Sequence, residues 1–386
     1  CATTGVPASA GPLLGFKSVP VGTDDTVRVP EGYEVQVIAR WGDPVGLSGE
    51  SPAFKPDGSN TSSDQEAQFG MHHDGIHYYP IDGSTSGLLV MNHEYVDDGL
   101  LHRDGTAAWS AEKVRKAQAA HGVSVCEVSR KDGQWSVVTP SPWARRITAR
   151  TPTVVSGPAA GHVLMRTAAD PAGRRVLGTL NNCASGKTPW GTYLTCEENF
   201  IFYFKGPDQP DAHQSRWGLR KGDPVGYRWH EHDERFDATR HPQEINRFGW
   251  VVEIDPANPS HTPIKRTALG RAAHEGATVA TTKSGRAVVY MGEDARFEYI
   301  YKFVSRDTVK PGGYAANSEL LDHGTLYVAR FDGNGRGVWI PLVHAQGPLT
   351  PANGFADQGE VLIKTRQASD RLGATKMDRP EWIAVD

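Results

Sequence analysis

Four apolar segments of the chain lie directly beside residues whose oxygen, nitrogen or sulfur atoms bind metal ions. They are 88–91 before Asn92, His93 and Glu94; 192–195 before Cys196, Glu197, Glu198 and Asn199; 288–291 before Glu293 and Asp294; and 277–281 after His274 and Glu275. Carboxylates gathered in one place repel one another unless cations neutralise them. Oxygen ligands suit calcium or magnesium, and an added thiolate or imidazole suits iron, zinc or manganese. The repeated pattern therefore predicts a shared metal site.

Taken singly, each of these glutamates is better explained as a solvated loop residue, because glutamate is mostly exposed in proteins. Cys183 lies in the turn-like segment 181–186, from which a loop presents its sulfur as a ligand. Cys196 follows an apolar segment, which is typical of a buried apolar residue. Alternatively, Cys183 and Cys196 form a disulfide, which an exported protein permits.

Two groups of histidines also lie near acids. They are His72, His73 and His77 around Asp74, and His230 and His232 beside Asp233. Packing within a hairpin explains the first group better than metal binding does. A surface position is favoured for the second group, which lies in a polar segment.

Three familiar motifs are incomplete in this chain. Residues 185–188 contain the Gly-Lys-Thr of a phosphate-binding loop, but Asn181 stands where its first glycine belongs. The segment from Asp332 begins like a calcium-binding hand, but Val343 replaces the bidentate glutamate. The chain contains no Gly-x-Ser-x-Gly nucleophile motif. Nucleotide-loop and serine-hydrolase chemistry are therefore disfavoured.

Composition narrows the class of protein further. The 386 residues carry 41 basic and 45 acidic side chains without long runs, which does not suit a nucleic-acid-coating protein. The longest apolar stretches are about a quarter of the ~20 residues that a membrane span needs. The 42 glycines and 26 prolines exceed average usage and favour short strands joined by tight turns.

The elements that must position the candidate ligands are mostly predicted strands. Predicted hairpins pair 76–80 with 87–92, 175–180 with 191–196, 287–291 with 299–304 and 325–331 with 337–341, and 248–254 is a further strand. Helices are expected at 110–120 and at 357–372, where Asp357 and Glu360 can cap the start and Gly373 the end. The pattern predicts an all-β sandwich, barrel or propeller, and the length favours a β-propeller.

Turn content and polarity divide the chain into an arm and a β domain that contains a polar segment. Residues 1–65 are turn-rich and predict an N-terminal arm with surface loops, and 66–386 predict the β domain. Within it, the polar segment 205–242 is expected to be a long loop that covers a site. No charged-then-apolar leader opens the chain. Cys1 suggests either a processed lipoprotein or exported precursor, or an arbitrary start of the sequence.

Several motifs, in order along the chain, resemble the PhoX-type alkaline phosphatase family. They are Asn92–Tyr95, Asn181–Cys183 with Thr188–Asn199, Arg247–Asp255, Gly270–Arg271 with His274–Ala277, Arg296–Phe303 and Met377–Glu381. The stretch CxxGxTPWGTxLTCEE is long and idiosyncratic, so it is highly specific. The resemblance runs from about residue 66 to the end of the chain.

The resemblance implies an exported bacterial phosphomonoesterase on a six-bladed β-propeller with a few helices and long loops. Such enzymes serve phosphate acquisition, use the twin-arginine (Tat) route, and are periplasmic or extracellular. The resemblance further implies a binuclear iron site with calcium, a metal-bound oxide or hydroxide that attacks small-molecule phosphate monoesters, and a monomer. A lipid anchor at Cys1 is a further expectation.

The resemblance also implies roles for individual residues. Cys183 is the expected thiolate ligand of one iron, Glu275 and Glu381 are iron-site carboxylates, and one or both of Glu197 and Glu198 are ligands. Arg379 is expected to hold a substrate phosphate oxygen, since guanidinium binds phosphate in bidentate fashion. Calcium binding or support of the ligands is expected of Asn92, Glu94, Glu293 and Asp294.

The sequence departs from the family pattern at its end. Family members continue well past the Asp378–Glu381 segment, with further blades and at least one more metal ligand. Either the sequence is a fragment that lacks these C-terminal blades, or its propeller closes with fewer strands than those of its relatives. An incomplete site would weaken the activity. Two alternatives remain open: a non-catalytic, calcium-stabilised propeller that binds a ligand or partner, and an iron oxidoreductase.

Overall fold

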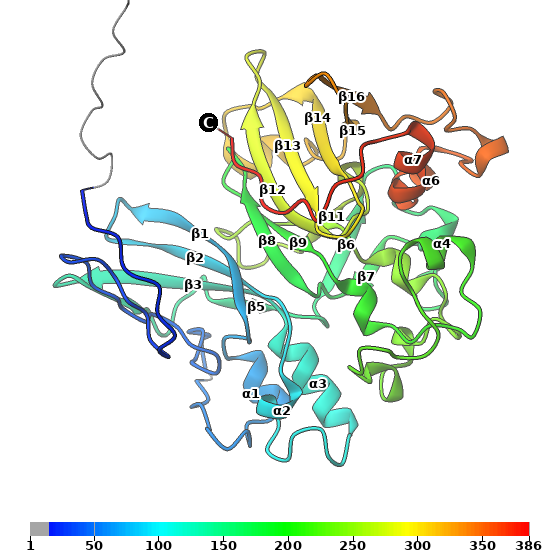
Figure 1. Cartoon of the computed structure of the whole chain (residues 1–386). Helices are drawn as coiled ribbons and strands as arrows, with labels where there is room; N and C mark the ends of the chain where they lie inside the picture. The colour runs from blue at the N-terminus through cyan, green and yellow to red at the C-terminus, as the bar shows by residue number, and fades with distance from the viewer. Residues whose placement is uncertain (1–14, 50, 386) are drawn as a thin grey trace, which may run out of the picture.

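The computed structural model describes residues 15–49 and 51–385, which fold into three β-sheets with a few short helices (Figure 1). The described strands form open sheets rather than a closed barrel. The fold is thus mostly β, as the sequence predicts. Cys1 and the start of the predicted arm lie outside the described residues.

The first sheet holds the N-terminal part of the β domain. Its strands are β1 (His73–Asp82), β2 (Ser86–His93), β3 (Gly122–Lys131), β4 (Gln134–Val137) and β5 (Arg145–Ile147). The order is β1-β2-β3-β4, with β5 also paired to β3. The antiparallel pairing of β1 with β2 places Tyr78 opposite Leu89. This pairing confirms the first predicted hairpin.

The second sheet corrects one predicted hairpin. Its strands are β6 (Pro152–Ser156), β7 (Arg175–Leu177), β8 (Asn182–Lys187), β9 (Tyr193–Glu197), β10 (Val251–Ile254) and β11 (Ile264–Arg266), in the order β7-β6-β11-β10-β9-β8. The pairing of 175–180 with 191–196 is wrong, because β9 pairs with β8 and β10. The small polar residues of β8 resemble a turn, yet Asn182 donates inside the core to Thr179 and Thr195 at 2.8 and 2.9 Å.

The third sheet confirms the last two predicted hairpins. Its strands are β12 (His274–Thr281), β13 (Arg286–Glu293), β14 (Ile300–Thr308), β15 (Gly324–Phe331) and β16 (Gly337–Pro341). They follow one another in sequence order across the sheet. Antiparallel pairs join β13 to β14 and β15 to β16.

The helices are short and lie outside the sheets. They are α1 (Ser62–Glu66), α2 (Asp98–Leu101), α3 (Ala111–Ala120), α4 (Ala212–Arg216), α5 (Gly313–Asn317), α6 (Gln358–Ile363) and α7 (Thr365–Leu372). Short 3-10 turns span Val163–Met165, Phe200–Tyr203, Trp229–Glu231, Glu234–Phe236, Glu244–Arg247, Thr267–Leu269 and Pro351–Asn353. The helix predicted at 110–120 is confirmed, with Ser110 as its cap. The helix predicted at 357–372 breaks in two at Lys364, whose backbone leaves the helical region.

Strand β8 lies where the three sheets meet, and glycines let the backbones approach one another there. It packs against β1 of the first sheet and β12 of the third. A Cβ atom added at Gly186 would lie 1.9 Å from the carbonyl oxygen of Ala277 on β12. One added at Gly75 on β1 would lie 2.5 Å from the hydroxyl of Ser185. Any side chain at these two positions would therefore push the sheets apart.

We expect the substitution Gly186→Ala to lower the free energy of unfolding by about 1–3 kcal/mol, because the new methyl group meets backbone that cannot move aside. Denaturant unfolding checks this value. Gly333→Ala is the matched control, since nothing lies within 4 Å of a Cβ atom there. That variant should stay within about 0.5 kcal/mol of the parent. Equal effects of the two substitutions would contradict the close approach of β8 and β12.

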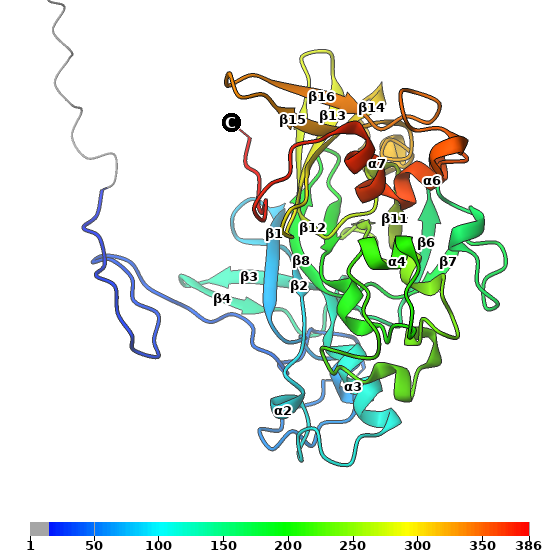
Figure 2. The ribbon, with the colours of Figure 1, turned by 45° about the vertical axis from the view of Figure 1, so that its right-hand side comes forward.

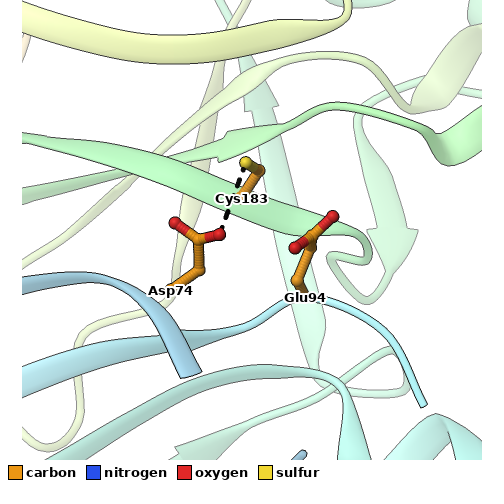
Figure 3. A group of neighbouring side chains, drawn as sticks. All are labelled: Asp74, Glu94 and Cys183. Atoms are coloured by element: carbon orange, nitrogen blue, oxygen red, sulfur yellow. Dashed lines mark hydrogen bonds between the residues drawn. The ribbon is translucent and has the colours of Figure 1, made fainter. Parts of the chain in front are cut away.

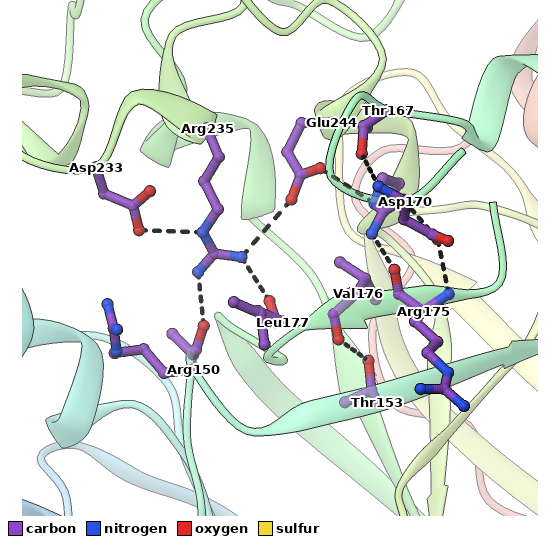
Figure 4. Close-up of polar contacts among 12 residues, drawn as sticks. Arg150, Thr153, Thr167, Asp170, Arg175, Val176, Leu177, Asp233, Arg235 and Glu244 are labelled. Atoms are coloured by element: carbon purple, nitrogen blue, oxygen red, sulfur yellow. Dashed lines mark hydrogen bonds and ion pairs between the residues drawn. The ribbon is translucent and has the colours of Figure 1, made fainter. Parts of the chain in front are cut away.

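The predicted polar loop 205–242 contains α4 and two 3-10 turns, and none of the strands of the three sheets lies within it. Arg235 fixes its end to the second sheet (Figure 4). The Arg235 guanidinium donates to the carbonyl of Leu177 on β7 at 2.6 Å and to Asp233 at 3.0 Å, and lies 3.6 Å from Glu244. The loop is therefore held in place by charge-assisted bonds.

Before α1, the described residues form no helix or strand. Figure 2 shows that the first of them extend away from the three sheets. The division of the chain at residue 65 stays a prediction. Within residues 15–49 and 51–385, no helix is both long and apolar enough to cross a bilayer.

Candidate metal centre

Seven acidic or thiol side chains gather where the three sheets meet. They form three overlapping groups: Asp74, Glu94 and Cys183; Cys183, Glu198 and Glu275; and Glu275, Asp294 and Glu381. Within each group, one ligand atom from every residue lies within 4.8 Å of the others. Because Cys183 and Glu275 are each shared by two groups, the three groups form one continuous cluster, which we call the acidic cluster.

The first group joins the first and second sheets. Asp74 comes from β1, Glu94 from the residue after β2, and Cys183 from β8. Their side chains converge in Figure 3, and the Cys183 Sγ lies 3.6 Å from Asp74 Oδ2. The candidate ligands of this group thus come from two different sheets.

A distortion of β8 places Cys183. The pairing of β8 with β9 shifts register between Asn182 and Ser185, and Cys183 lies within this irregularity. Asn92 donates to the carbonyl oxygens of Cys183 and Ala184 at 2.6 and 3.0 Å. Asn92 is fully buried and lies outside the acidic cluster. It therefore holds the backbone that carries the thiol.

Burial and mutual repulsion perturb the acids of the cluster. Burial first, and then Asp74, raise the pKa of Glu94 to about 7. Burial with Glu275 raises the pKa of Glu198 to about 9, and burial with Asp294 raises that of Glu275 to about 8. Burial, followed by the neighbouring carboxylates, also raises the pKa of the Cys183 thiol. These groups ionise together only if cations neutralise them.

The far end of the cluster contains the predicted phosphate-binding arginine. The Arg379 guanidinium lies 2.6 Å from Asp294 Oδ2 and 3.4 Å from Glu381. Its side chain is about half exposed. The second oxygen of Asp294, Oδ1, is buried and has no hydrogen-bond partner among the residues that the structure describes. A buried carboxylate oxygen without a partner, beside other carboxylates, suits a metal ligand.

Two predicted ligands instead form buried ion pairs outside the cluster. Glu197 accepts from Lys265 Nζ at 2.7 Å, with both side chains fully buried, and from the amides of Gly249 and Trp250. Glu293 accepts from Arg366 at 2.7 Å and from the Tyr301 hydroxyl at 2.9 Å. The structure does not bring Glu197 or Glu293 into any of the three groups.

The adjacent glutamates offer a direct test. Glu198→Gln should lower the metal affinity of the protein about tenfold or more, because it removes a charge from the acidic cluster. Glu197→Gln should leave the metal content of the folded protein unchanged. It should cost about 3–5 kcal/mol of stability, since Lys265 would remain buried without its partner. Metal analysis together with denaturant unfolding separates the two effects. Loss of metal from the Glu197 variant alone would reverse the assignment.

Asp74 was not predicted as a ligand, although it lies among the histidines singled out in the sequence. Those histidines do not enter the acidic cluster. His72 stacks on Tyr95 with ring centroids 3.8 Å apart, and His73 bonds to the Gly70 carbonyl. The sequence feature that could have identified Asp74 is its position at the start of β1. Because β1 pairs antiparallel with β2, the start of β1 lies beside the end of β2, which leads to Glu94.

The cysteines settle one of the open alternatives. Within residues 15–49 and 51–385, Cys126, Cys183 and Cys196 form no disulfide, so the predicted disulfide between Cys183 and Cys196 is wrong. Cys196 is fully buried in the apolar core with Leu194 and Val251, as expected for an apolar role. Cys183 faces the carboxylates instead.

A mostly β fold with a continuous thiol and carboxylate cluster defines a candidate metalloprotein. Over residues 14–386 the chain matches the family described as alkaline phosphatase PhoX, and it belongs to that family. A solved structure of Pseudomonas fluorescens PhoX in complex with vanadate, a transition state analogue, is 51% identical to the chain, with a TM-score of 0.93. The match covers 96% of this chain and 66% of that one, just under two thirds. A comparison with curated proteins gave no match.

Proposed function

We propose that the chain is a metal-dependent alkaline phosphatase that hydrolyses phosphate monoesters and releases inorganic phosphate. The observation that carries the proposal is the acidic cluster, which combines one thiol with six carboxylates in a member of the PhoX family. The similar Pseudomonas fluorescens PhoX structure is a complex with vanadate, a transition state analogue. Clustered cations stabilise charge in such a transfer.

The donor set supports a binuclear iron site with calcium. Cys183, Glu198, Glu275 and Glu381 would hold iron, since a thiolate combined with carboxylates suits that metal. Asp74, Glu94 and Asp294 add the oxygen ligands that calcium prefers. Bound metal ions would supply positive charge that neutralises the phosphate and lowers the barrier to attack on phosphorus.

Arg379 would orient the phosphate. Its guanidinium lies at the edge of the cluster, and its half-exposed side chain leaves donors free to face a substrate. The ion pairs with Asp294 and Glu381 hold the guanidinium in place before the substrate arrives. A fixed planar donor pair suits two phosphate oxygens better than a lysine would.

The proposal extends to the architecture, the export route and the location of the protein. The three sheets would be blades of a six-bladed β-propeller, with the acidic cluster on the channel side. Ligands scattered from Asp74 to Glu381 require a folded chain before metals bind, which fits export of the folded protein by the Tat route. We further propose a periplasmic or extracellular monomer that acts on small-molecule esters.

Hydrolysis of p-nitrophenyl phosphate before and after chelation, with metal analysis of the purified protein, tests the function. We expect turnover at alkaline pH that is lost with the metals and restored with them. Metal without turnover at any pH from 7 to 10 would instead support the non-catalytic binding module. Turnover that survives complete metal removal would overturn the proposed mechanism.

A further inference from the structure

A cavity of about 410 Å³ opens beside the acidic cluster. Glu198 belongs to both the cluster and the cavity wall. The wall also contains Ala273 and Ala295, and the amide of Asp294 donates to the Ala273 carbonyl at 3.1 Å. The cavity therefore reaches the side of the cluster formed by Glu198 and Asp294. Its volume lies within the range of small-molecule sites.

Most of the wall is apolar or aromatic. One side is the segment after β9, with Phe200, Phe202 and Phe204, and the other is the polar loop, with Trp217, Leu219 and Val225. Most of the aromatic groups are buried, whereas Phe202 and Val225 are about half exposed at the wall. The loop that the sequence predicts to cover a site thus supplies one side of this cavity.

One charged group at the cavity, Arg366, is already engaged, and the wall also contains the exposed Arg220. Arg366 donates to Glu293 at 2.7 Å and lies 3.6 Å from Glu298. The guanidinium groups of Arg271 and Arg366 lie over the Trp217 ring at 4.1 and 4.3 Å. The cavity therefore offers mainly apolar surface, with the Glu198 carboxyl and the Arg220 guanidinium as charged groups in its wall.

The walls are held rigidly. Arg216, next to Trp217, donates to both oxygens of Glu298 at 2.6 and 2.9 Å and to Asp370 at 2.7 Å. The end of the same loop is fixed by Arg235 (Figure 4). A preformed apolar cavity loses little conformational entropy when a ligand enters it.

We propose that this cavity receives the alcohol half of the phosphomonoester, and that it favours esters of flat aromatic alcohols over small or polar ones. The inference rests on the proposed phosphatase function. A phosphate at the acidic cluster would place its ester oxygen beside Glu198, where the cavity begins. The aromatic wall then removes the apolar group from water, and this contribution differs between substrates with the same phosphate.

The test compares 2-naphthyl phosphate with phenyl phosphate, whose leaving phenols have similar acidity. In the parent protein, kcat/KM should be about tenfold higher for the naphthyl ester. Phe202→Ala should remove most of that preference and leave inhibition by inorganic phosphate unchanged. Phe331→Ala, which removes a half-exposed phenylalanine from β15 and not from this cavity, is the matched control and should keep the preference.

A second variant and a binding measurement test the cavity independently of Phe202→Ala and of turnover. Val225→Asp places a charge in the wall and should also reduce the naphthyl preference. Calorimetry with 2-naphthylmethylphosphonate and methylphosphonate tests the cavity without turnover. Tighter binding of the naphthyl compound, reduced by Phe202→Ala, supports the cavity even if no ester is hydrolysed, in which case only the phosphatase function fails. Equal binding of the two phosphonates, or unchanged preference in both variants, overturns the cavity assignment.

Discussion

Replacing Cys183 with alanine is expected to lower the proposed phosphatase activity at least about a hundredfold and to reduce the metal content of the purified protein. The thiol is shared by two of the three groups, so its loss weakens both. Burial and the surrounding carboxylates raise its pKa, so a metal ion is needed to displace the proton. Metal analysis and p-nitrophenyl phosphate hydrolysis measure the two effects.

Cys126→Ala is the matched control for this substitution. Cys126 is also a free, buried cysteine, but it packs in the first sheet with Phe69 and Met91, outside the acidic cluster. This variant should keep its metal and its activity after allowance for any loss of stability. A Cys183 variant that retains full metal content and full rate would remove the thiol from the site.

Metal removal should make the stability of the protein depend more strongly on pH. The folded metal-free protein holds protons on Glu94, Glu198 and Glu275 with pKa values of about 7, 9 and 8, above the ordinary value of 4.5. Their contribution to stability is complete below pH about 4.5 and is lost as the pH rises through these values. The difference in Tm between metal-loaded and metal-free protein should therefore widen from pH 5 to pH 9, by on the order of 5 °C.

Comparison of the metal-loaded and metal-free forms isolates the contribution of the acidic cluster to the pH dependence of stability. Other buried groups, such as His121 and Lys265, titrate in both forms and cancel in the difference. Glu198→Gln removes one of the raised carboxyl groups and should reduce the widening. Thermal unfolding at several pH values measures the gap. A gap that stays constant from pH 5 to pH 9 would show that protons and metals do not compete for these carboxylates.

Much of the fold could be predicted from local patterns. The hairpins formed by β1 with β2, β13 with β14 and β15 with β16 follow from apolar runs on either side of turn residues. The helix at 110–120 was also predicted, and the structure shows that Ser110 caps its start. The hairpin assigned to 175–180 and 191–196 failed because β8 is rich in small polar residues, whose hydrogen bonds lie inside the core.

The candidate site was predicted in part. The structure brings six of the residues named from the sequence into the acidic cluster: Glu94, Cys183, Glu198, Glu275, Asp294 and Glu381. Their assignment as metal ligands remains a proposal. Asp74 was not assigned because no local pattern separates it from its neighbouring histidines. Its approach to Cys183 depends on contact between β1 and β8, strands about 110 residues apart in the chain.

By itself, the sequence determined the family, the mostly β character and the placement of acids at strand ends. Two pairs of adjacent acidic residues occur at strand ends, and only the tertiary structure decided which residue of each pair faces the acidic cluster. Glu198 and Asp294 face it, whereas Glu197 and Glu293 pair with buried cations. The side chains of successive residues in an extended chain point to opposite sides. A shift in strand register by one residue would therefore exchange a candidate ligand with a residue of a buried ion pair. That register is set by distant strands.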